Sequence, residues 1–196
     1  MDEIVLRSIA KWPDAPAVYG WLALDRRGNW RIKTAAGRFE RIANAGLIEF
    51  IGRNYAADSK GRWFFQNGPQ RVYVSLDYTP WVYRLDGSGS ALVAHTGAVP
   101  RAFESAFLDD AGALLLQSDL GIGVLLDRDL PAVLERAARS HGGDAGLLIE
   151  AMLQGREARI VLQGVSVALA AIRGEDVPRR FGFVPRPTPR PGEPEC

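Results

Sequence analysis

Asp58-Ser-Lys-Gly61, followed directly by Arg-Trp63-Phe-Phe65, joins an Asp-x-x-Gly phrase to an apolar run. The phrase occurs three more times, as Asp25-Arg-Arg-Gly28, Asp86-Gly-Ser-Gly89 and Asp109-Asp-Ala-Gly112. An aspartate side chain can accept a hydrogen bond from a backbone N–H two residues on, and glycine adopts the positive φ that closes a type I turn with a bulge. We therefore predict four hairpin turns, each leading into a β-strand.

The unequal spacing of the four phrases argues against a β-propeller. Their glycines are 33, 28 and 23 residues apart, whereas propeller blades repeat at a steady period of about 40–50 residues. We interpret the phrases as turns between successive hairpins of one sheet system, which explains them without any chemistry.

Apolar alternation predicts β-hairpins at residues 18–33, 57–97, 113–126 and 158–169. Helical spacing predicts one helix within residues 40–55, and two more are expected after Asp129 and Asp144, which suit the N-cap position. Residues 1–16 are expected to be irregular. The predicted fold class is α+β, mostly antiparallel β-hairpins in a meander, with about three helices.

We expect three segments along the chain. Residues 1–100 form an N-terminal hairpin-rich unit with one helix, and residues 101–176 form C-terminal β-hairpins plus two helices packed on the same core. The joint is expected near residues 100–105. Residues 177–196 are rich in Pro and Arg, a composition typical of a disordered tail.

The two halves share a spacing. Gly61 precedes Gln66 by the same interval that separates Gly112 from Gln117, and the strands that follow end near Asp77 and Asp127. These intervals suggest the hypothesis that the halves are related.

Composition narrows the class of protein. The chain has 196 residues, 24 Lys and Arg against 23 Asp and Glu, and 47% hydrophobic residues. Such balance gives no global attraction to nucleic acid or to an anionic membrane, and no apolar run approaches the 18 residues of a membrane span. The only cysteine is Cys196, and the acidic start does not resemble a signal peptide. We expect a cytoplasmic protein with neither a nucleic-acid nor a membrane partner.

The sequence contains no pattern typical of a metal site or of a catalytic nucleophile. His95 and His141 are the only histidines and have no partners at metal-ligand spacing. The serines lack a Gly-x-Ser-x-Gly elbow, and Cys196 has no nearby histidine. We therefore expect neither metal nor cofactor.

A polar and aromatic strand face is the main candidate for function. It combines side-chain amides, a guanidinium and aromatic rings, which suit a peptide, a sugar or a small carboxylate. The candidate residues are Gln66, Asn67, Gln70, Arg71, Tyr73 and Trp81. A turn at Asn67 flanked by half-buried strand residues would explain the same residues structurally.

Three functional hypotheses follow. The first is a non-enzymatic ligand-binding or protein-interaction module that uses this face, with a small molecule, another protein or a second copy of the chain as its partner. An enzyme acting on a small polar substrate is the alternative, with Asp77 and Asp127 as acid and base. The third is a structural subunit whose aromatic surface pairs with another protein.

Two stretches resemble a known family when taken together. The first runs from Lys11-Trp-Pro to Asn-Trp30, and the second from Phe50-Ile-Gly to Thr79-Pro-Trp81. They resemble an uncharacterised bacterial family of about 200 residues, catalogued only as a domain of unknown function. The resemblance spans most of the chain apart from its tail, implies a free-standing cytoplasmic protein, and transfers no activity.

Overall fold

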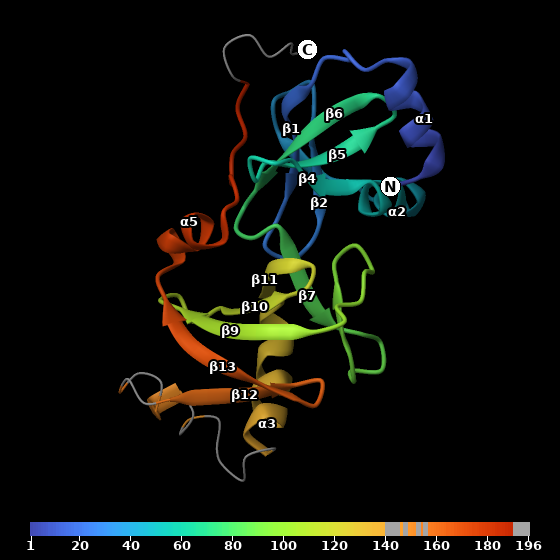
Figure 1. Ribbon diagram of the computed structural model, residues 1–196. Helices are drawn as coiled ribbons and strands as arrows, with labels where there is room; N and C mark the ends of the chain where they lie inside the picture. The colour runs from blue at the N-terminus through green and yellow to red at the C-terminus, as the bar shows by residue number, and fades with distance from the viewer. Residues whose placement is uncertain (140–145, 147–148, 152–153, 155–156, 190–196) are drawn as a thin grey trace. The chain divides into compact units, whose positions relative to one another are not determined.

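The computed structural model describes residues 1–139, 146, 149–151, 154 and 157–189. By contacts, the chain divides into two compact units (Figure 1). Unit 1 comprises Met1–Pro80 with Phe181–Cys196, and unit 2 comprises Trp81–Arg180. The chain therefore leaves unit 1 once and returns to it.

Unit 1 is built on a six-stranded sheet of order β3-β2-β1-β6-β5-β4. Only the central pair, β1 with β6, is parallel. The elements are α1 (Glu3–Lys11), β1 (Val18–Leu24), β2 (Trp30–Lys33), β3 (Phe39–Arg41), α2 (Ala45–Arg53), β4 (Tyr55–Ala57), β5 (Trp63–Asn67) and β6 (Gln70–Leu76).

One face of this sheet packs against α2. Phe50 of α2 meets Phe65 of β5 edge to face at 5.4 Å, and Tyr55 meets Trp30 at 5.1 Å. Ile51 of α2 and Val5 of α1 are each only 1% exposed. Burial of these apolar side chains is what holds the short helices in place, because helices of nine residues are marginal alone.

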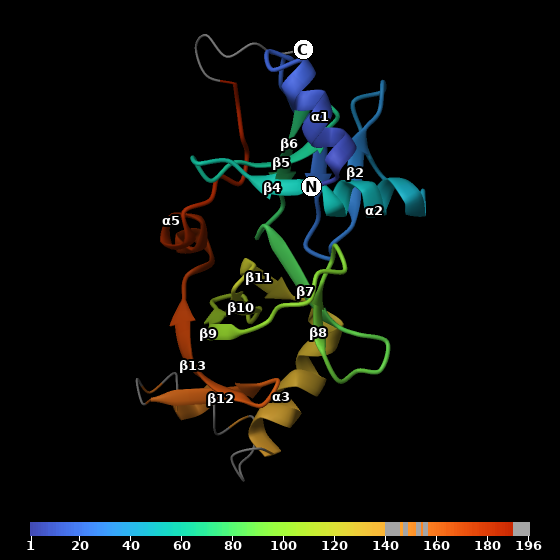
Figure 2. The ribbon, with the colours of Figure 1, turned by 45° about the vertical axis from the view of Figure 1, so that its right-hand side comes forward.

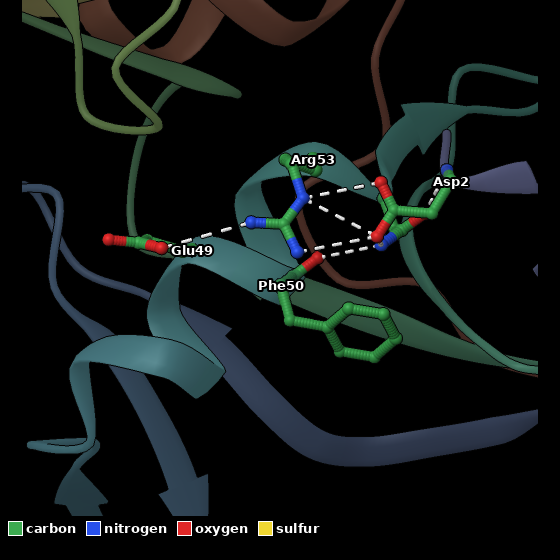
Figure 3. A network of polar contacts seen from close by, with 5 residues as sticks. Asp2, Glu49, Phe50 and Arg53 are labelled. Atoms are coloured by element: carbon green, nitrogen blue, oxygen red, sulfur yellow. Dashed lines mark hydrogen bonds and ion pairs between the residues drawn. The ribbon is translucent and has the colours of Figure 1, made fainter.

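A polar network joins the start of α1 to the end of α2 (Figure 3). The Asp2 backbone N–H donates to Oδ1 of buried Asn54 at 2.8 Å, and Asn54 Nδ2 donates to Asp2 Oδ2 at 3.2 Å. The Arg53 guanidinium points at the same carboxylate, and Glu49 lies on its other side at 3.9 Å. The first residues of the chain are thereby tied to a segment about 50 residues on.

Unit 2 contains a seven-stranded sheet of order β12-β13-β9-β10-β11-β7-β8. The pairs β11 with β7 and β13 with β9 are parallel, and the others are antiparallel. Its elements are β7 (Trp81–Leu85), β8 (Leu92–Ala94), β9 (Phe103–Asp109), β10 (Leu114–Ser118), β11 (Gly121–Leu125), η1 (Asp127–Asp129), α3 (Leu130–Arg139), β12 (Ala158–Leu162), β13 (Val165–Ile172), η2 (Gly174–Asp176) and α5 (Val177–Phe181). α5 crosses the boundary at Arg180 back to unit 1.

The two units share a topology. The strand order β2-β1-β6-β5-β4 of unit 1 corresponds to β8-β7-β11-β10-β9 of unit 2. A shift of 51 residues carries the pair Phe64–Tyr73 onto Leu115–Val124, and Ala57–Trp63 onto Leu108–Leu114. The repeated interval in the sequence therefore reflects two similar halves, as hypothesised.

All four Asp-x-x-Gly phrases form the predicted turns. In each, the glycine has positive φ, its N–H donates to the backbone carbonyl of the aspartate, and the aspartate Oδ1 accepts two backbone N–H groups. Two further turns, Thr34 to Gly37 and Ala94 to Gly97, use the same backbone bonds without an aspartate. The α+β fold class is confirmed, with two mixed sheets that are rich in antiparallel pairs.

Several local expectations differ from the structure. Residues 3–11 form α1 rather than an irregular lead-in, because Val5 packs into the core. Asp129 does precede a helix, but its Oδ2 accepts the backbone N–H of Leu85 at 2.9 Å. The helix expected after Asp144 falls mostly outside the described residues.

The division of the chain also differs from the expected one. The units separate between Pro80 and Trp81, about twenty residues before the expected joint, because β7 pairs with β11. Residues 177–189, expected to be disordered, include α5 and the buried Phe183. Val184 N donates to Gly61 O at 2.9 Å and Leu76 N donates to Pro185 O at 2.7 Å, so this segment bonds to the chain just before β5 and to the end of β6.

We predict that Gly61→Ala destabilises unit 1 more than Gly37→Ala does. Both glycines have positive φ in equivalent turns, so alanine costs about 1–2 kcal/mol of backbone strain at either site. A Cβ at Gly61 would also overlap the carbonyl oxygen of Gly182, whereas nothing lies within 4 Å of a Cβ at Gly37. Urea unfolding of both variants measures the difference. Equal losses would show that the return segment does not constrain Gly61.

Candidate functional site

The β5–β6 hairpin carries five of the six residues of the predicted strand face. Gln66 pairs with Arg71 and Asn67 pairs with Gln70, while Tyr73 pairs with Phe64 further from the turn. Because side chains alternate along a strand, Gln66, Arg71 and Tyr73 share one face, and Asn67 and Gln70 point to the other.

Most of the polar groups on this hairpin bond within the protein. Gln66 is 2% exposed, and its Nε2 donates to Gly68 O at 3.0 Å. Gln70 Nε2 donates to Pro16 O at 3.0 Å. Asn67 and Arg71 are exposed, and the Arg71 guanidinium lies 4.6 Å from the centre of the Phe64 ring. The hairpin therefore offers a small exposed polar surface around Arg71.

Tyr73 belongs to a buried cluster with Tyr19, Asp58 and Arg62. Its ring stacks on that of Tyr19 at 4.6 Å and 13°. Its hydroxyl accepts from Arg62 Nη2 at 2.9 Å and donates to Asp58 Oδ2 at 3.2 Å. Burial is the main cause that raises the pKa of Tyr73.

The ion pair in this cluster is short and enclosed. Arg62 Nε lies 2.7 Å from Asp58 Oδ2, and each side chain is 8% exposed. Burial acts to raise the pKa of Asp58, but hydrogen bonds from the side chain and backbone of Arg62 and from the Lys60 backbone outweigh it, so the pKa is lowered. Arg62 also pairs through its backbone with Val184. The cluster therefore braces the place where the return segment meets the sheet.

The remaining predicted residues lie elsewhere. Trp81 is a buried residue of unit 2. It packs so closely on Gly123 that a Cβ added to this glycine would lie 2.8 Å from the Cβ of Trp81. Asp77 of unit 1 lies 3.7 Å from Arg31, and Asp127 of unit 2 is exposed at the start of η1. The proposed acid and base thus belong to different compact units.

Unit 2 contains a cavity of about 740 Å³ that the strand-face hypothesis did not anticipate. Its lining residues come from the ends of β9 and β13 and from η2 and α5, which follow β13 in the chain. Figure 2 shows β13 leading to α5. The lining residues are Leu108, Asp109, Asp110, Ala171, Ile172, Arg173, Asp176, Arg179 and Arg180. Apolar, acidic and basic side chains therefore share one cavity.

Three guanidinium groups lie at this cavity. Arg179 Nη2 contacts Asp176 Oδ1 at 2.8 Å, and Arg173 Nη2 contacts Glu175 Oε1 at 2.7 Å. Arg180 lies over the Phe107 ring at 4.6 Å from its centre. A guanidinium has five N–H donors in a planar fork, so one that holds a carboxylate can still bind another.

Two carboxylates of the cavity are fixed by backbone groups. Asp109 Oδ1 accepts the N–H groups of Ala111 and Ala113 at 2.9 and 2.7 Å, as its turn requires. Asp110 Oδ1 accepts the Gly174 N–H at 2.7 Å, and this bond is the main cause that lowers the pKa of Asp110. Asp110 is therefore a charged acceptor at neutral pH and a poor general base.

Sequence comparison assigns the chain to a family. The family model DUF2944, described as "Protein of unknown function (DUF2946)", matches residues 1–188. The chain belongs to the DUF2944 family. This match confirms the resemblance to an uncharacterised family of about 200 residues and covers both units.

A crystal structure of a DUF1285 family protein from Silicibacter pomeroyi DSS-3 is similar to the DUF2944 chain. The TM-score is 0.51 at 12% sequence identity, over 86% of this chain and 88% of that one. Such a likeness shows a shared fold and nothing of function. No curated protein matches this sequence.

Two features are absent from the described part of the DUF2944 chain. No helix there has the length and apolar character needed to cross a membrane. Likewise, the described residues hold no group of three or more His, Cys, Asp or Glu side chains suited to a metal ion.

Sequence reasoning missed the cavity because its lining comes from distant segments. The parallel pairing of β13 with β9 brings Ile172 beside Asp109, 63 positions earlier in the chain. The adjacent acidic pair Asp109-Asp110 and the basic pair Arg179-Arg180 were visible signals. A turn explained the first pair, and an expected disordered tail explained the second.

We predict that Asp58→Asn lowers the free energy of unfolding by about 3 kcal/mol near neutral pH, because it leaves the buried Arg62 guanidinium without its counter-charge. The pKa of Asp58 is lowered in the folded state, so its contribution is present above the unfolded pKa of about 3.9 and is lost as the pH falls through the folded value. Urea unfolding from pH 7 down to pH 3 should show the two proteins converging at the acid end.

Asp25→Asn is the matched control. Asp25 closes the equivalent turn, but its carboxylate bonds to backbone N–H groups and Asn29. The Oδ1 of asparagine can still accept both backbone N–H groups, and the bond from Asn29 Nδ2 to the second oxygen is lost, so the loss should be about 1 kcal/mol. Similar losses in the two variants would rule out a special role for the Asp58–Arg62 pair.

Proposed function

We propose that this DUF2944 protein is a non-enzymatic binding module that holds a small organic carboxylate in the cavity of unit 2. The observation that carries the proposal is the cavity itself, where the guanidinium groups of Arg173, Arg179 and Arg180 line the same space as an apolar surface. Its volume of about 740 Å³ is within the range of roughly 300–1,000 Å³ that is common for small-molecule sites.

The lining suits a ligand with an anionic and an apolar end. Leu108, Ala171 and Ile172 supply aliphatic carbon, which favours burial of a hydrocarbon group. Arginine binds carboxylates through two parallel N–H bonds, which gives orientation as well as affinity. Exposed ion pairs with Asp176 and Glu175 favour one orientation of two of the guanidiniums before a ligand arrives.

A binding role is favoured over catalysis by the chemistry of the lining. Its described residues include neither a histidine, a cysteine nor a serine that could act as a nucleophile or a proton shuttle. The lowered pKa of Asp110 makes it a charge partner rather than a base.

The strand face of the β5–β6 hairpin supports a binding role less strongly. The polar ends of Gln66, Gln70 and Tyr73 are engaged inside unit 1. Arg71 and Asn67 are its exposed members among the predicted residues. For these reasons we place the ligand in unit 2.

The cytoplasm of a bacterium is the setting that we propose for this module. The single cysteine, Cys196, supports a compartment in which disulfides do not form. The strong excess of arginine over lysine supports an origin in a GC-rich genome: only Lys11, Lys33 and Lys60 are lysines.

We predict that Ala171→Trp weakens carboxylate binding at least tenfold, because the indole occupies the cavity. Ala171 is exposed on β13, so the larger side chain should not disturb the core. Titration with 4-methylpentanoate and 3-phenylpropanoate, followed by amide chemical shifts, measures the affinity. The wild type should show saturable shifts around Asp110 and Gly174, and the variant should bind at least tenfold more weakly.

Ala168→Trp is the matched control, since Ala168 is exposed on the same strand and is not among the lining residues. It should bind both acids as the wild type does. The proposal fails if the wild type binds neither these acids nor their α-amino acid counterparts, or if Ala171→Trp binds them equally well.

A further inference from the structure

We propose that the ligand of this cavity is a zwitterion, a free α-amino acid with an apolar side chain. This inference rests on the proposed binding function and goes further by naming the ligand class. It starts from the balance of charge: three carboxylates, of Asp109, Asp110 and Asp176, line the cavity beside three guanidiniums.

The mixed lining disfavours ligands with one sign of charge. A plain carboxylate that approaches the guanidiniums also meets the three aspartates, and a plain amine meets the same groups in reverse. Like charges brought close in a partly desolvated site repel each other, and specificity in binding sites often depends on such repulsion. A ligand with both charges can satisfy both kinds of group.

Asp110 is the residue best placed to hold the ligand's ammonium group. A carboxylate offers about four acceptor positions, and the Gly174 N–H uses one of them on Oδ1. This bond fixes the orientation of the carboxylate across 64 residues of sequence, from the turn after β9 to the start of η2. Asp110 is a carboxylate at neutral pH, and the Gly174 N–H lowers its pKa further.

The ligand's carboxylate is assigned to α5. Arg179 and Arg180 are adjacent on this helix, both are exposed, and both line the cavity. Arg179 is held by Asp176 at 2.8 Å, so its fork is oriented in advance. The apolar side chain of the amino acid would then lie on Leu108, Ala171 and Ile172.

One side of the cavity is built by elements without a counterpart in the described part of unit 1. In unit 1, β4 is an edge strand of its sheet, whereas the corresponding β9 pairs with β13. Arg173, Asp176, Arg179 and Arg180 all follow β13 in the chain. The strands that unit 2 shares with unit 1 thus supply the Asp109 turn, and the segment after β13 supplies the arginines.

Matched compounds test the inference. L-leucine, 4-methylpentanoate and isopentylamine share one apolar group and differ only in their charged groups, and L-phenylalanine, 3-phenylpropanoate and phenethylamine form a second such set. We expect at least one of the two amino acids to bind the full-length protein at least tenfold more tightly than its acid or its amine. Isothermal titration calorimetry at pH 7 measures the affinities.

Asp110→Asn then isolates the ammonium contact. Asparagine can still accept the Gly174 N–H, so the fold is retained, but its charge is gone. The variant should bind the amino acid and the matched acid with similar affinity. Glu104→Gln, which removes an exposed carboxylate of β9 outside the lining, should keep the wild-type preference.

The outcomes separate this inference from the proposed function. If the acids bind as tightly as the amino acids, or if Asp110→Asn still prefers the amino acid to its matched acid, the zwitterion proposal is wrong. The proposal of a carboxylate site then stands. If none of the acids or amino acids binds the wild type, both proposals are overturned. Binding of the amines alone would also overturn both.

Discussion

The Asp-x-x-Gly turn is the constraint on which much of this structure depends. One carboxylate oxygen accepts two backbone N–H groups, and the glycine takes the positive φ that lets the chain reverse. Each turn thereby fixes which residues of the two flanking strands pair, since a slip of one residue would break both bonds and turn every side chain to the other face. The identical register of β4 with β5 and of β9 with β10 follows from this local chemistry, because the Asp58 and Asp109 turns join these strands.

The Asp-x-x-Gly turn has different structural roles in the two units. At Asp58 the second carboxylate oxygen holds the buried Arg62, and the cluster braces the returning chain. At Asp109 the corresponding position to Arg62 is Ala113, and the next residue, Asp110, bonds to Gly174. The same type of turn therefore supports a buried ion pair in unit 1 and forms one wall of a cavity in unit 2.

Local features of the fold could be predicted from the sequence, and long-range features could not. The turns were predictable because Asp and Gly act within five residues of each other, and α2 was predictable because its apolar spacing is regular. The parallel pairs β1–β6, β7–β11 and β9–β13 join strands that are distant in the chain, and alternation looks the same for parallel and antiparallel neighbours. Five of the strand-face residues flank the turn expected at Asn67, and Trp81 lies on a later strand, but the contacts of Gln70 and Tyr73 depend on partners such as Pro16 and Tyr19 that no pattern reveals.

The difference between the repeated strands and the segment after β13 also explains where we expect a ligand site. Satisfied polar groups such as Arg62 and Tyr73 cannot exchange their partners without loss of stability, since an unpaired buried charge is costly. Exposed cations on a short helix, such as Arg179 on α5, hold their partners at little free energy and can share them with a ligand. Polar residues that are already enclosed by the repeat therefore stabilise it, whereas the recognition that we propose uses charged groups that line open space beside it.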